Sequence, residues 1–269
     1  MSIYLTKSRF KFGLESVTKL YYTGKKYEYA DQKIDAKFMQ ALAEGGHQAG
    51  ALSLFEFCDN PHADNIIIDT LDYEESLRIT NEKLALNGKV VIAEAAFKYN
   101  NLFIRADIIV KEDNVINLYE VKAKSFNSEE QDDQSLIAGK GDKERISSEL
   151  ESYLYDIAFQ KYVVAKAFPN YVVNSHLLLV DKSKRGSGDG FNKIFQIIKD
   201  NSGSGSVDIT QIHKNQLGSS IFTIINTDLI VDKIWNNYKV TYTLDTEFSF
   251  EEFIHFCEDI YVRYGILFL

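Results

Sequence analysis

Two carboxylates and one lysine lie on two neighbouring predicted strands of this sequence. Asp107 lies in an apolar run at 102–110, and Glu120 and Lys122 end a second run that follows a short polar turn. Two such runs joined by a polar turn predict a β-hairpin. Because alternate residues of a strand point to one face, Glu120 and Lys122 project together, and Asp107 can meet them across the hairpin.

These residue types suit the hydrolysis of phosphate esters assisted by a divalent cation. Two carboxylates supply the oxygen ligands that Mg²⁺ prefers, and the ion retains waters for substrate and nucleophile. Such a cation lowers the pKa of a bound water and neutralises the charge that grows on the phosphate. Lys122 can then orient that water or stabilise the transition state. A surface ladder of salt bridges is the alternative interpretation of the same three residues.

Composition limits the remaining classes. The chain has 269 residues, 45% of them hydrophobic, which is enough for one large domain with a substantial core. The net charge of −9 argues against a general nucleic-acid binder, although a metal site rich in carboxylates is itself negative. No apolar run has the length of a membrane span or a signal peptide, and the two cysteines form no framework. We therefore expect a cytoplasmic protein with no membrane partner.

The hydrophobic pattern predicts a mixture of helices and strands. Residues 1–57 have a mainly helical pattern, with Ser8 as a helix cap and a bend at Gly45 and Gly46. The period of strands is found at 66–68, 90–97, 102–110, 115–121, 176–180 and 207–212. Further helices are predicted at 147–168, 228–238 and 249–264. The predicted fold class is α/β (α+β): a central mixed sheet flanked by helices on both faces.

A glycine-serine run at 200–206 is the clearest boundary signal in the chain. It divides a core of residues 1–200, which includes the N-terminal helical part, from an extension of residues 207–269 packed on that core. The extension either completes the sheet or forms a small helical lobe. The acidic, polar segment at 127–145 predicts a solvent-exposed loop.

Three segments of the chain, in this order, carry a resemblance to a known enzyme family. They are YLTKSRFKFGLESVTKLYY at 4–22, EAAFKYNNLFIRADIIVKEDNVINLYEVKAKS at 94–125 and YDIAFQKYVVAKAFP at 155–169. They resemble the opening helix, the motif core and the following helix of the RecB-like and Cas4-like PD-(D/E)XK nucleases. The resemblance is closest to the N-terminal nuclease module of bacterial proteins that carry the domain of unknown function DUF2779. It implies a restriction-endonuclease-like sheet.

The resemblance implies roles for individual residues. Asp107 and Glu120 are similar to the metal-binding carboxylates of the family, and Lys122 is similar to its catalytic lysine. The backbone carbonyl of Val121 is expected to complete the coordination. His47, in the segment EGGHQAG, stands where RecB-like nucleases often supply a histidine ligand.

Two departures from the family pattern narrow this expectation. Gln160 resembles the catalytic-site glutamine of a QxxxY helix motif, but Val164 stands where the tyrosine would fall, with Tyr162 near it as an additional candidate. Ser16 stands where Cas4-like relatives place the first of four cysteines that bind an iron–sulfur cluster. The resemblance therefore implies Mg²⁺ or Mn²⁺ as cofactor and no iron–sulfur cluster.

Two further charged residues each have two interpretations. Glu94 is either a third carboxylate at the edge of the site or an ordinary cross-strand charge. Lys124 follows Lys122 at strand spacing, and it either contacts a substrate phosphate or is a solvated surface lysine.

The leading functional hypothesis is metal-dependent hydrolysis of phosphodiester bonds by a metal-activated water. DNA is the favoured substrate, with RNA as a second. The alternative is a catalytically silent PD-(D/E)XK fold that binds nucleic acid or serves in assembly. A phosphate-handling enzyme on another scaffold is disfavoured, because the sequence contains no GxxxxGK[ST], GxSxG or HExxH motif.

Overall fold

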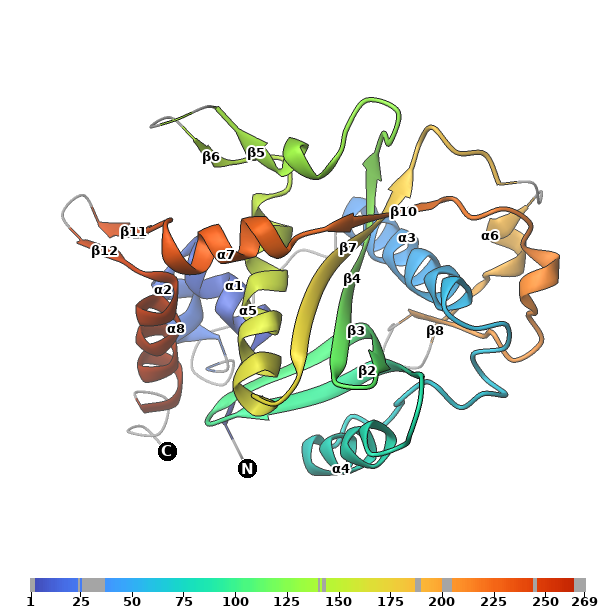
Figure 1. The fold of residues 1–269 in the computed structure, drawn as a ribbon, viewed down its shortest axis with the longest axis horizontal. Coiled ribbons are helices and arrows are strands. Elements are labelled where there is room, and N and C mark those ends of the chain that lie inside the picture. Colours follow the sequence, from blue (N-terminus) through green and yellow to red (C-terminus); the bar gives the residue numbers. More distant parts are fainter. Residues whose placement is uncertain are drawn as a thin grey trace.

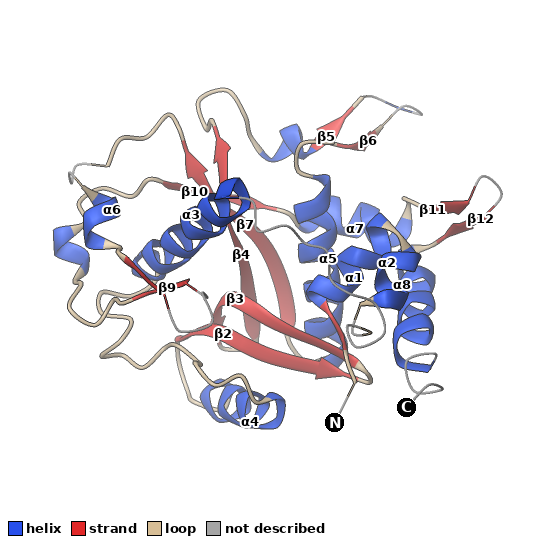
Figure 2. Ribbon diagram, turned by 180° about the vertical axis from the view of Figure 1, so that it is seen from behind, coloured by secondary structure: helices blue, strands red, loops and turns tan. Residues whose placement is uncertain are grey.

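A six-stranded mixed sheet with helices on both faces forms the centre of the protein (Figures 1 and 2). The computed structural model describes residues 3–23, 25, 37–139, 141, 144–186, 190–199, 205–243 and 246–263. The predicted fold class is confirmed. Within the described residues, no helix combines the length and the apolar character needed to cross a membrane.

Three long strands form the antiparallel meander that the sequence predicts. They are β2 (Val90–Tyr99), β3 (Leu102–Glu112) and β4 (Val115–Phe126). The other strands of this sheet are β7 (Val172–Asp181), parallel to β4; β10 (Phe222–Asn226), antiparallel to β7; and β1 (Leu5–Thr6), parallel to the start of β3. The apolar run of β7 is buried between two helical layers, as expected for a strand with a parallel neighbour inside a sheet.

One face of the sheet carries the larger part of the core. The helices on this face are α1 (Lys7–Glu15), α2 (Val17–Tyr22), α5 (Glu151–Ala167), α7 (Asp228–Asn236) and α8 (Phe250–Glu258), which a π-helical turn (Asp259–Arg263) continues. Phe10 of α1 stacks on Phe159 of α5 with ring centroids 4.5 Å apart. This contact fixes α1, and with it the residue that begins that helix, against α5.

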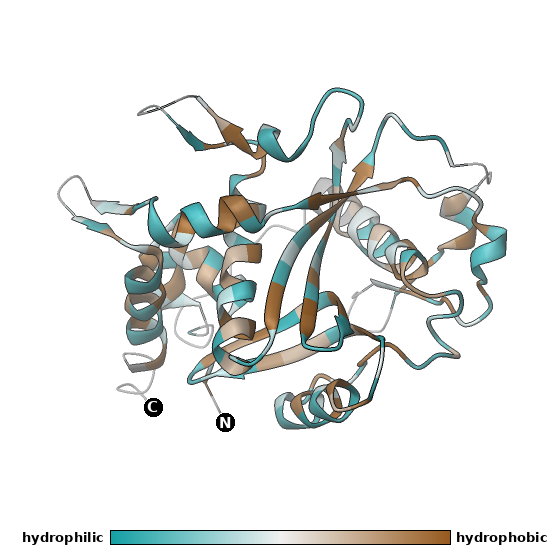
Figure 3. Ribbon diagram, in the orientation of Figure 1, coloured by the Kyte–Doolittle hydropathy of each residue, from teal (hydrophilic) through white to brown (hydrophobic). Residues whose placement is uncertain are grey.

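The opposite face is covered by α3 (Lys37–Ser53), a 3₁₀ turn (Leu54–Glu56) and α6 (Phe191–Ile194). Figure 3 shows apolar residues along β4 and β7, between the two layers, and hydrophilic residues over much of α4 (Tyr73–Leu84). Small pairs of strands lie outside the central sheet: β5 (Ile137–Ala138) with β6 (Arg145–Ile146), β8 (Ile197–Lys199) with β9 (Gly205–Val207), and β11 (Val240–Thr243) with β12 (Thr246–Phe248). Two further 3₁₀ turns span Asp133–Leu136 and Lys214–Gln216.

Several local predictions in the N-terminal part are wrong. Thr6, not Ser8, precedes the first helix, and the extended backbone of Ser16 (φ −173°) divides the predicted helix into α1 and α2. Gly45 and Gly46 lie inside the continuous helix α3, because a glycine lowers helix stability without preventing a helix that packs well. The start of the predicted second helix, at 30–36, lies outside the described residues.

The helix α4 is absent from the predictions for a physical reason. Asp72 caps it by accepting a hydrogen bond from the backbone N–H of Glu75 at 2.8 Å. Its buried side chains include Ser76 and Thr80, and the Thr80 hydroxyl accepts a hydrogen bond from the backbone N–H of Ala96 in β2. Small polar residues thus face the sheet, so a search for an apolar stripe does not find this helix. The predicted strand at 66–68 forms only a single bridge, from residue 67 to residue 93.

The C-terminal part of the chain shares the sheet and the core with the rest. β10 adds an edge strand to the central sheet, and α7 and α8 contribute buried residues to the main core cluster. The described part of residues 207–269 therefore adds one strand to the sheet and two helices to the layer on its face. The strand predicted at 207–212 is wrong, because only its first residue pairs, as the end of β9. Much of the glycine-serine run lies outside the described residues.

Candidate active site

The strand β3 has a gap in its pairing where Asp107 lies. One edge of β3 pairs with β2, whereas β1 covers the other edge at residues 102–103 and β4 covers it from Ile108 to Glu112. Beyond Tyr119 the strand β4 leaves β3 and continues beside β7, and Glu120 is the first residue after this point. The sheet therefore forks between β1 and β4, and Asp107 and Glu120 lie at the fork.

The ammonium of Lys7 fills this fork. Lys7 follows β1 directly as the first residue of α1, and its Nζ donates to both oxygens of Glu120 at 3.0 Å. The same Nζ lies 3.4 Å from Oδ1 of Asp107. The other oxygen of Asp107, Oδ2, accepts a hydrogen bond from the backbone N–H of Val121 at 2.8 Å. Two carboxylates thus converge on a single cation position.

Lys122 contacts the same cluster, as its two-residue spacing from Glu120 predicts. It donates a hydrogen bond to Oε1 of Glu120, and its Nζ lies 3.7 Å from Oδ2 of Asp156 on α5. The Nζ also lies 5.5 Å from the centre of the Tyr153 ring, within the range of a cation–π contact. Two carboxylates and one aromatic face therefore hold this lysine in place.

Gln160 completes the contacts of Glu120. It is fully buried on α5, and its Nε2 donates to Oε2 of Glu120 at 2.6 Å. Its Oε1 is buried with no hydrogen-bond partner among the described residues. Val164 is a core residue, and Tyr162 lies away from the cluster, where its hydroxyl donates to Glu251 of α8 at 2.6 Å. The expectation for Tyr162 is therefore corrected, because a residue two positions after Gln160 does not share its face of the helix.

The charges and the burial in this cluster shift the pKa values of the two carboxyl groups at the fork in opposite directions. Burial and the Glu120 charge together raise the pKa of Asp107 to about 6, although Lys7 and Lys122 partly oppose the rise. Burial alone would also raise the pKa of Glu120, but the two ammonium groups outweigh it and hold this pKa well below its ordinary value. Glu120 is therefore the carboxylate that stays charged at every physiological pH.

A cavity of about 410 Å³ opens beside Asp107. Its lining includes His47 of α3, Glu94 of β2 and Val121 of β4, so the structure brings three further candidates to the neighbourhood of Asp107. His47 is exposed, and a side chain at Gly205 would contact its ring, 3.6 Å from Cδ2. Metal ligation by His47 and by the carbonyl of Val121 stays a prediction.

Glu94 forms a cross-strand ion pair, and its role as a third carboxylate of the site stays a prediction. It lines the cavity, and its Oε2 also lies 3.2 Å from Nε of Arg105, as a cross-strand ion pair. The pairs of residue 93 with 108 and of residue 95 with 106 place Glu94 opposite Asp107 in the register. Its φ of +57° is unusual for a residue with a side chain and marks a local irregularity of β2 at the fork. Lys124 is partly buried on β4, and its contact with a phosphate stays a prediction.

The residues at the fork fit a divalent cation. Within the described residues, no group of three or more His, Cys, Asp and Glu side chains is arranged as a ready metal site. However, Asp107 and Glu120 already share one positive ion, the ammonium of Lys7, at hydrogen-bonding distances. Oxygen ligands of this kind are those that Mg²⁺ and Mn²⁺ prefer. Gln160, which donates to Oε2 of Glu120, also carries a buried acceptor, Oε1, with no partner among the described residues.

Sequence reasoning missed three residues of this cluster: Lys7, Tyr153 and Asp156. Asp156 precedes Gln160 by four residues and so shares its helix face, which a search for polar residues on the buried side of α5 would have found. Lys7 begins a helix, where a positive charge is unfavourable next to the helix dipole. That unfavourable position is the signal that a tertiary partner holds it.

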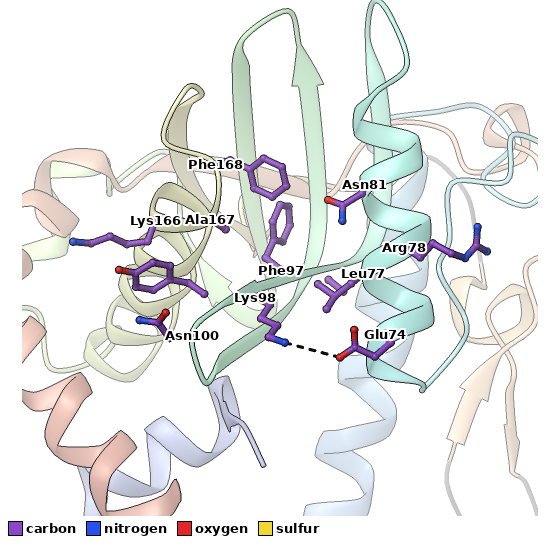
Figure 4. Close-up of a pocket in the computed structure, with 12 residues that line it drawn as sticks. Glu74, Leu77, Arg78, Asn81, Phe97, Lys98, Asn100, Lys166, Ala167 and Phe168 are labelled. Atoms are coloured by element: carbon purple, nitrogen blue, oxygen red, sulfur yellow. Dashed lines mark ion pairs between the residues drawn. The ribbon is translucent and has the colours of Figure 1, made fainter. Parts of the chain in front are cut away.

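A larger cavity lies elsewhere in the protein. Its volume is about 690 Å³, and it opens between α4, the tip of the β2–β3 hairpin and the end of α5 (Figure 4). The charged side chains that line it already have partners: Lys98 lies 4.0 Å from Glu74, and Lys166 lies 3.1 Å from Glu251. None of the fork carboxylates lines this cavity, so it does not extend the candidate site.

Comparison with known proteins adds no relative to these observations. Neither the models of protein families, nor the curated proteins, nor the solved structures include a significant match to this chain.

Proposed function

We propose that the protein is a metal-dependent nuclease of the PD-(D/E)XK type whose active site is the fork between β1 and β4. The observation that carries this proposal is the convergence of Asp107 and Glu120 on one cation position, with Lys122 hydrogen-bonded to Glu120. An apolar hairpin has no need of three ionisable groups at one point. A site for a cation and a phosphate does need them.

The chain's own residues divide the work of such a reaction. Asp107 and Glu120 would hold Mg²⁺ or Mn²⁺, which supplies charge neutralisation at the phosphate and activation of water when it is bound. Gln160 fixes the orientation of Glu120 through its hydrogen bond at 2.6 Å. Lys122, held by Glu120 and Asp156, presents a fixed positive charge toward the phosphate as charge develops in the transition state. DNA is the favoured substrate and RNA the second.

A cleavage assay tests the proposal. The purified chain is incubated with labelled single-stranded DNA, double-stranded DNA and single-stranded RNA, in Mg²⁺, in Mn²⁺ and in EDTA. We expect cutting of at least one substrate with either metal and none in EDTA. Folded protein that cuts none of the three with either metal contradicts the proposal.

A second function is favoured by one observation. Lys7 satisfies both fork carboxylates within the protein, as a structural ion pair would in a catalytically silent PD-(D/E)XK fold that binds nucleic acid or serves in assembly. Such a fold could still bind a divalent cation at the fork without cutting nucleic acid. Metal-dependent cleavage, and not metal binding, therefore separates the two functions.

We predict that metal affinity depends on pH through Asp107. The pKa of this buried carboxyl is raised to about 6, so it is largely protonated at pH 5 and charged at pH 7. A metal ligand must be deprotonated, so Mn²⁺ affinity should rise with pH, by about tenfold per unit below pH 6. Glu120 does not contribute, because its pKa lies far below this range. Titration at pH 5, 6 and 7 measures the effect, and equal affinity at the three values would contradict the prediction.

A further inference from the structure

We propose that Lys7 is a built-in counter-cation of the metal site, which a divalent ion must displace when it binds. This inference rests on the proposed function and adds to it a mode of regulation. Lys7 would keep the fork carboxylates paired and closed in the metal-free protein. Metal binding would then open the site by exchanging one cation for another.

The first argument is that Lys7 and a metal would use the same oxygen atoms. The Nζ of Lys7 takes both oxygens of Glu120 and Oδ1 of Asp107 at 3.0 to 3.4 Å. Gln160 already binds Oε2 of Glu120, Lys122 binds Oε1 of Glu120, and the N–H of Val121 binds Oδ2 of Asp107. The position where a metal ion could contact both carboxylates is therefore the position that the Lys7 ammonium occupies. An ion there would stand in direct contact with the ammonium.

The second argument is electrostatic. Three carboxylates, Asp107, Glu120 and Asp156, face two ammonium groups, Lys7 and Lys122, in the closed cluster. Replacing the single charge of Lys7 by a divalent ion leaves this cluster neutral. Retaining Lys7 as well would place like charges in contact in a buried site, where their repulsion is little screened. Displacement of the Lys7 ammonium by the divalent ion is therefore favoured over binding of both cations at the fork.

The third argument is that Lys7 lies on the outer side of the cluster. Its side chain is 22% exposed, whereas that of Glu120 is fully buried. As the first residue of α1 it opposes the helix dipole, and the carboxylates alone compensate this. A long side chain on a helix end can rotate away while α1 stays packed through Phe10 on Phe159.

The experiment compares Mn²⁺ binding by the full chain and by the variant Lys7→Met, with no nucleic acid present. Calorimetric titration gives the affinity, and thermal unfolding in EDTA and in saturating Mn²⁺ gives the stability. We expect Lys7→Met to bind Mn²⁺ about tenfold or more tightly than the wild type, because it lacks a competitor equivalent to one charged hydrogen bond. It should unfold at a lower temperature than the wild type in EDTA and gain more from Mn²⁺.

Matched variants make the result specific. Lys19→Met removes an exposed cation of α2, whose Nζ lies 2.8 Å from Oε2 of Glu15, and should leave Mn²⁺ affinity unchanged within about twofold. Lys7→Arg keeps the charge and should restore the competition. If Lys7→Met does not fold in EDTA, Lys7→Gln replaces it, since its amide still hydrogen-bonds to the carboxylates. Equal or weaker Mn²⁺ binding by both neutral variants would overturn the proposal.

A structure of the wild-type protein with Mn²⁺ decides the matter without any variant. Anomalous scattering should locate the ion between Asp107 and Glu120, with Nζ of Lys7 moved off both. An ion at the fork with Lys7 still bound to Glu120 would contradict the exchange. Failure of the nuclease proposal looks different: Lys7→Met then binds Mn²⁺ more tightly, yet neither protein cuts nucleic acid. If neither protein binds Mn²⁺ at all, both proposals fail.

Discussion

Replacing Glu120 by glutamine should lower the free energy of unfolding by roughly 3 kcal/mol in the metal-free protein, the lower end of the range for breaking a buried ion pair. Glu120 is fully buried and accepts hydrogen bonds from Lys7, Lys122 and Gln160. The glutamine is almost the same size, so the effect is that of lost charge and not of a cavity. Both lysines would lose their closest partner but keep Asp107 and Asp156, which favours the lower end.

Urea unfolding in EDTA measures this change, and Glu112→Gln is its matched control. Glu112 lies in the same meander, where its ion pair with Lys89 at 3.6 Å is more than half exposed. A pair of this kind contributes about 1 kcal/mol or less. Equal small changes for Glu120→Gln and Glu112→Gln would show that the buried cluster is not held by charge. A large loss for Glu120→Gln alone, with no stabilisation by Mn²⁺, is the expected result.

The variant Lys122→Ala should cut nucleic acid at least about 10²-fold more slowly at saturating metal and substrate, as expected when one fixed electrostatic contact to a transition state is lost. The structure places Lys122 within reach of the cluster through Glu120 and Asp156, with the Tyr153 ring beside it. Glu120 keeps its contact with Gln160, so the metal ligands should remain in place. Mn²⁺ affinity should therefore change far less than the cleavage rate.

Single-turnover cleavage by Lys122→Ala and by Lys89→Ala separates this role from a general loss of positive charge. Lys89 is an exposed lysine directly before β2, with its own carboxylate partner. We expect Lys89→Ala to cut at close to the wild-type rate. A Lys122→Ala protein that is folded, binds Mn²⁺ and cuts at the wild-type rate would remove Lys122 from the chemistry.

The strand core was predictable because its signals are local. The meander β2–β3–β4 and the buried strand β7 have apolar or alternating runs bounded by polar turns, and the helices α7 and α8 have the spacing of one buried stripe. The helix α5 was predicted, but its single buried stripe is wrong, because every residue from Asp156 to Val164 is buried. The helix α4 and the edge strand β10 were not predicted. α4 buries small hydroxyl side chains instead of an apolar stripe. β10 is only five residues long, and it is recognised as a strand only through its pairing with β7.

The site was predictable only where its residues are neighbours along the chain. The spacing of Glu120 and Lys122 within a strand, and the hairpin that brings Asp107 near them, follow from local rules. Lys7 lies 113 positions from Glu120 in the sequence. The two side chains meet only because β1, which precedes Lys7, pairs with the start of β3. Such long-range contacts are products of the fold, so spacing rules do not detect them.

The most direct test of the whole account compares single-turnover DNA cleavage by the wild type, Asp107→Asn and Asp113→Asn, purified in parallel and assayed in Mn²⁺ and in EDTA. Asp113 lies in the exposed turn between β3 and β4, close in sequence to Asp107 but away from the fork. Our account predicts Mn²⁺-dependent cutting by the wild type and by Asp113→Asn, and its loss in Asp107→Asn. Equal cutting by all three proteins would contradict an active site at Asp107.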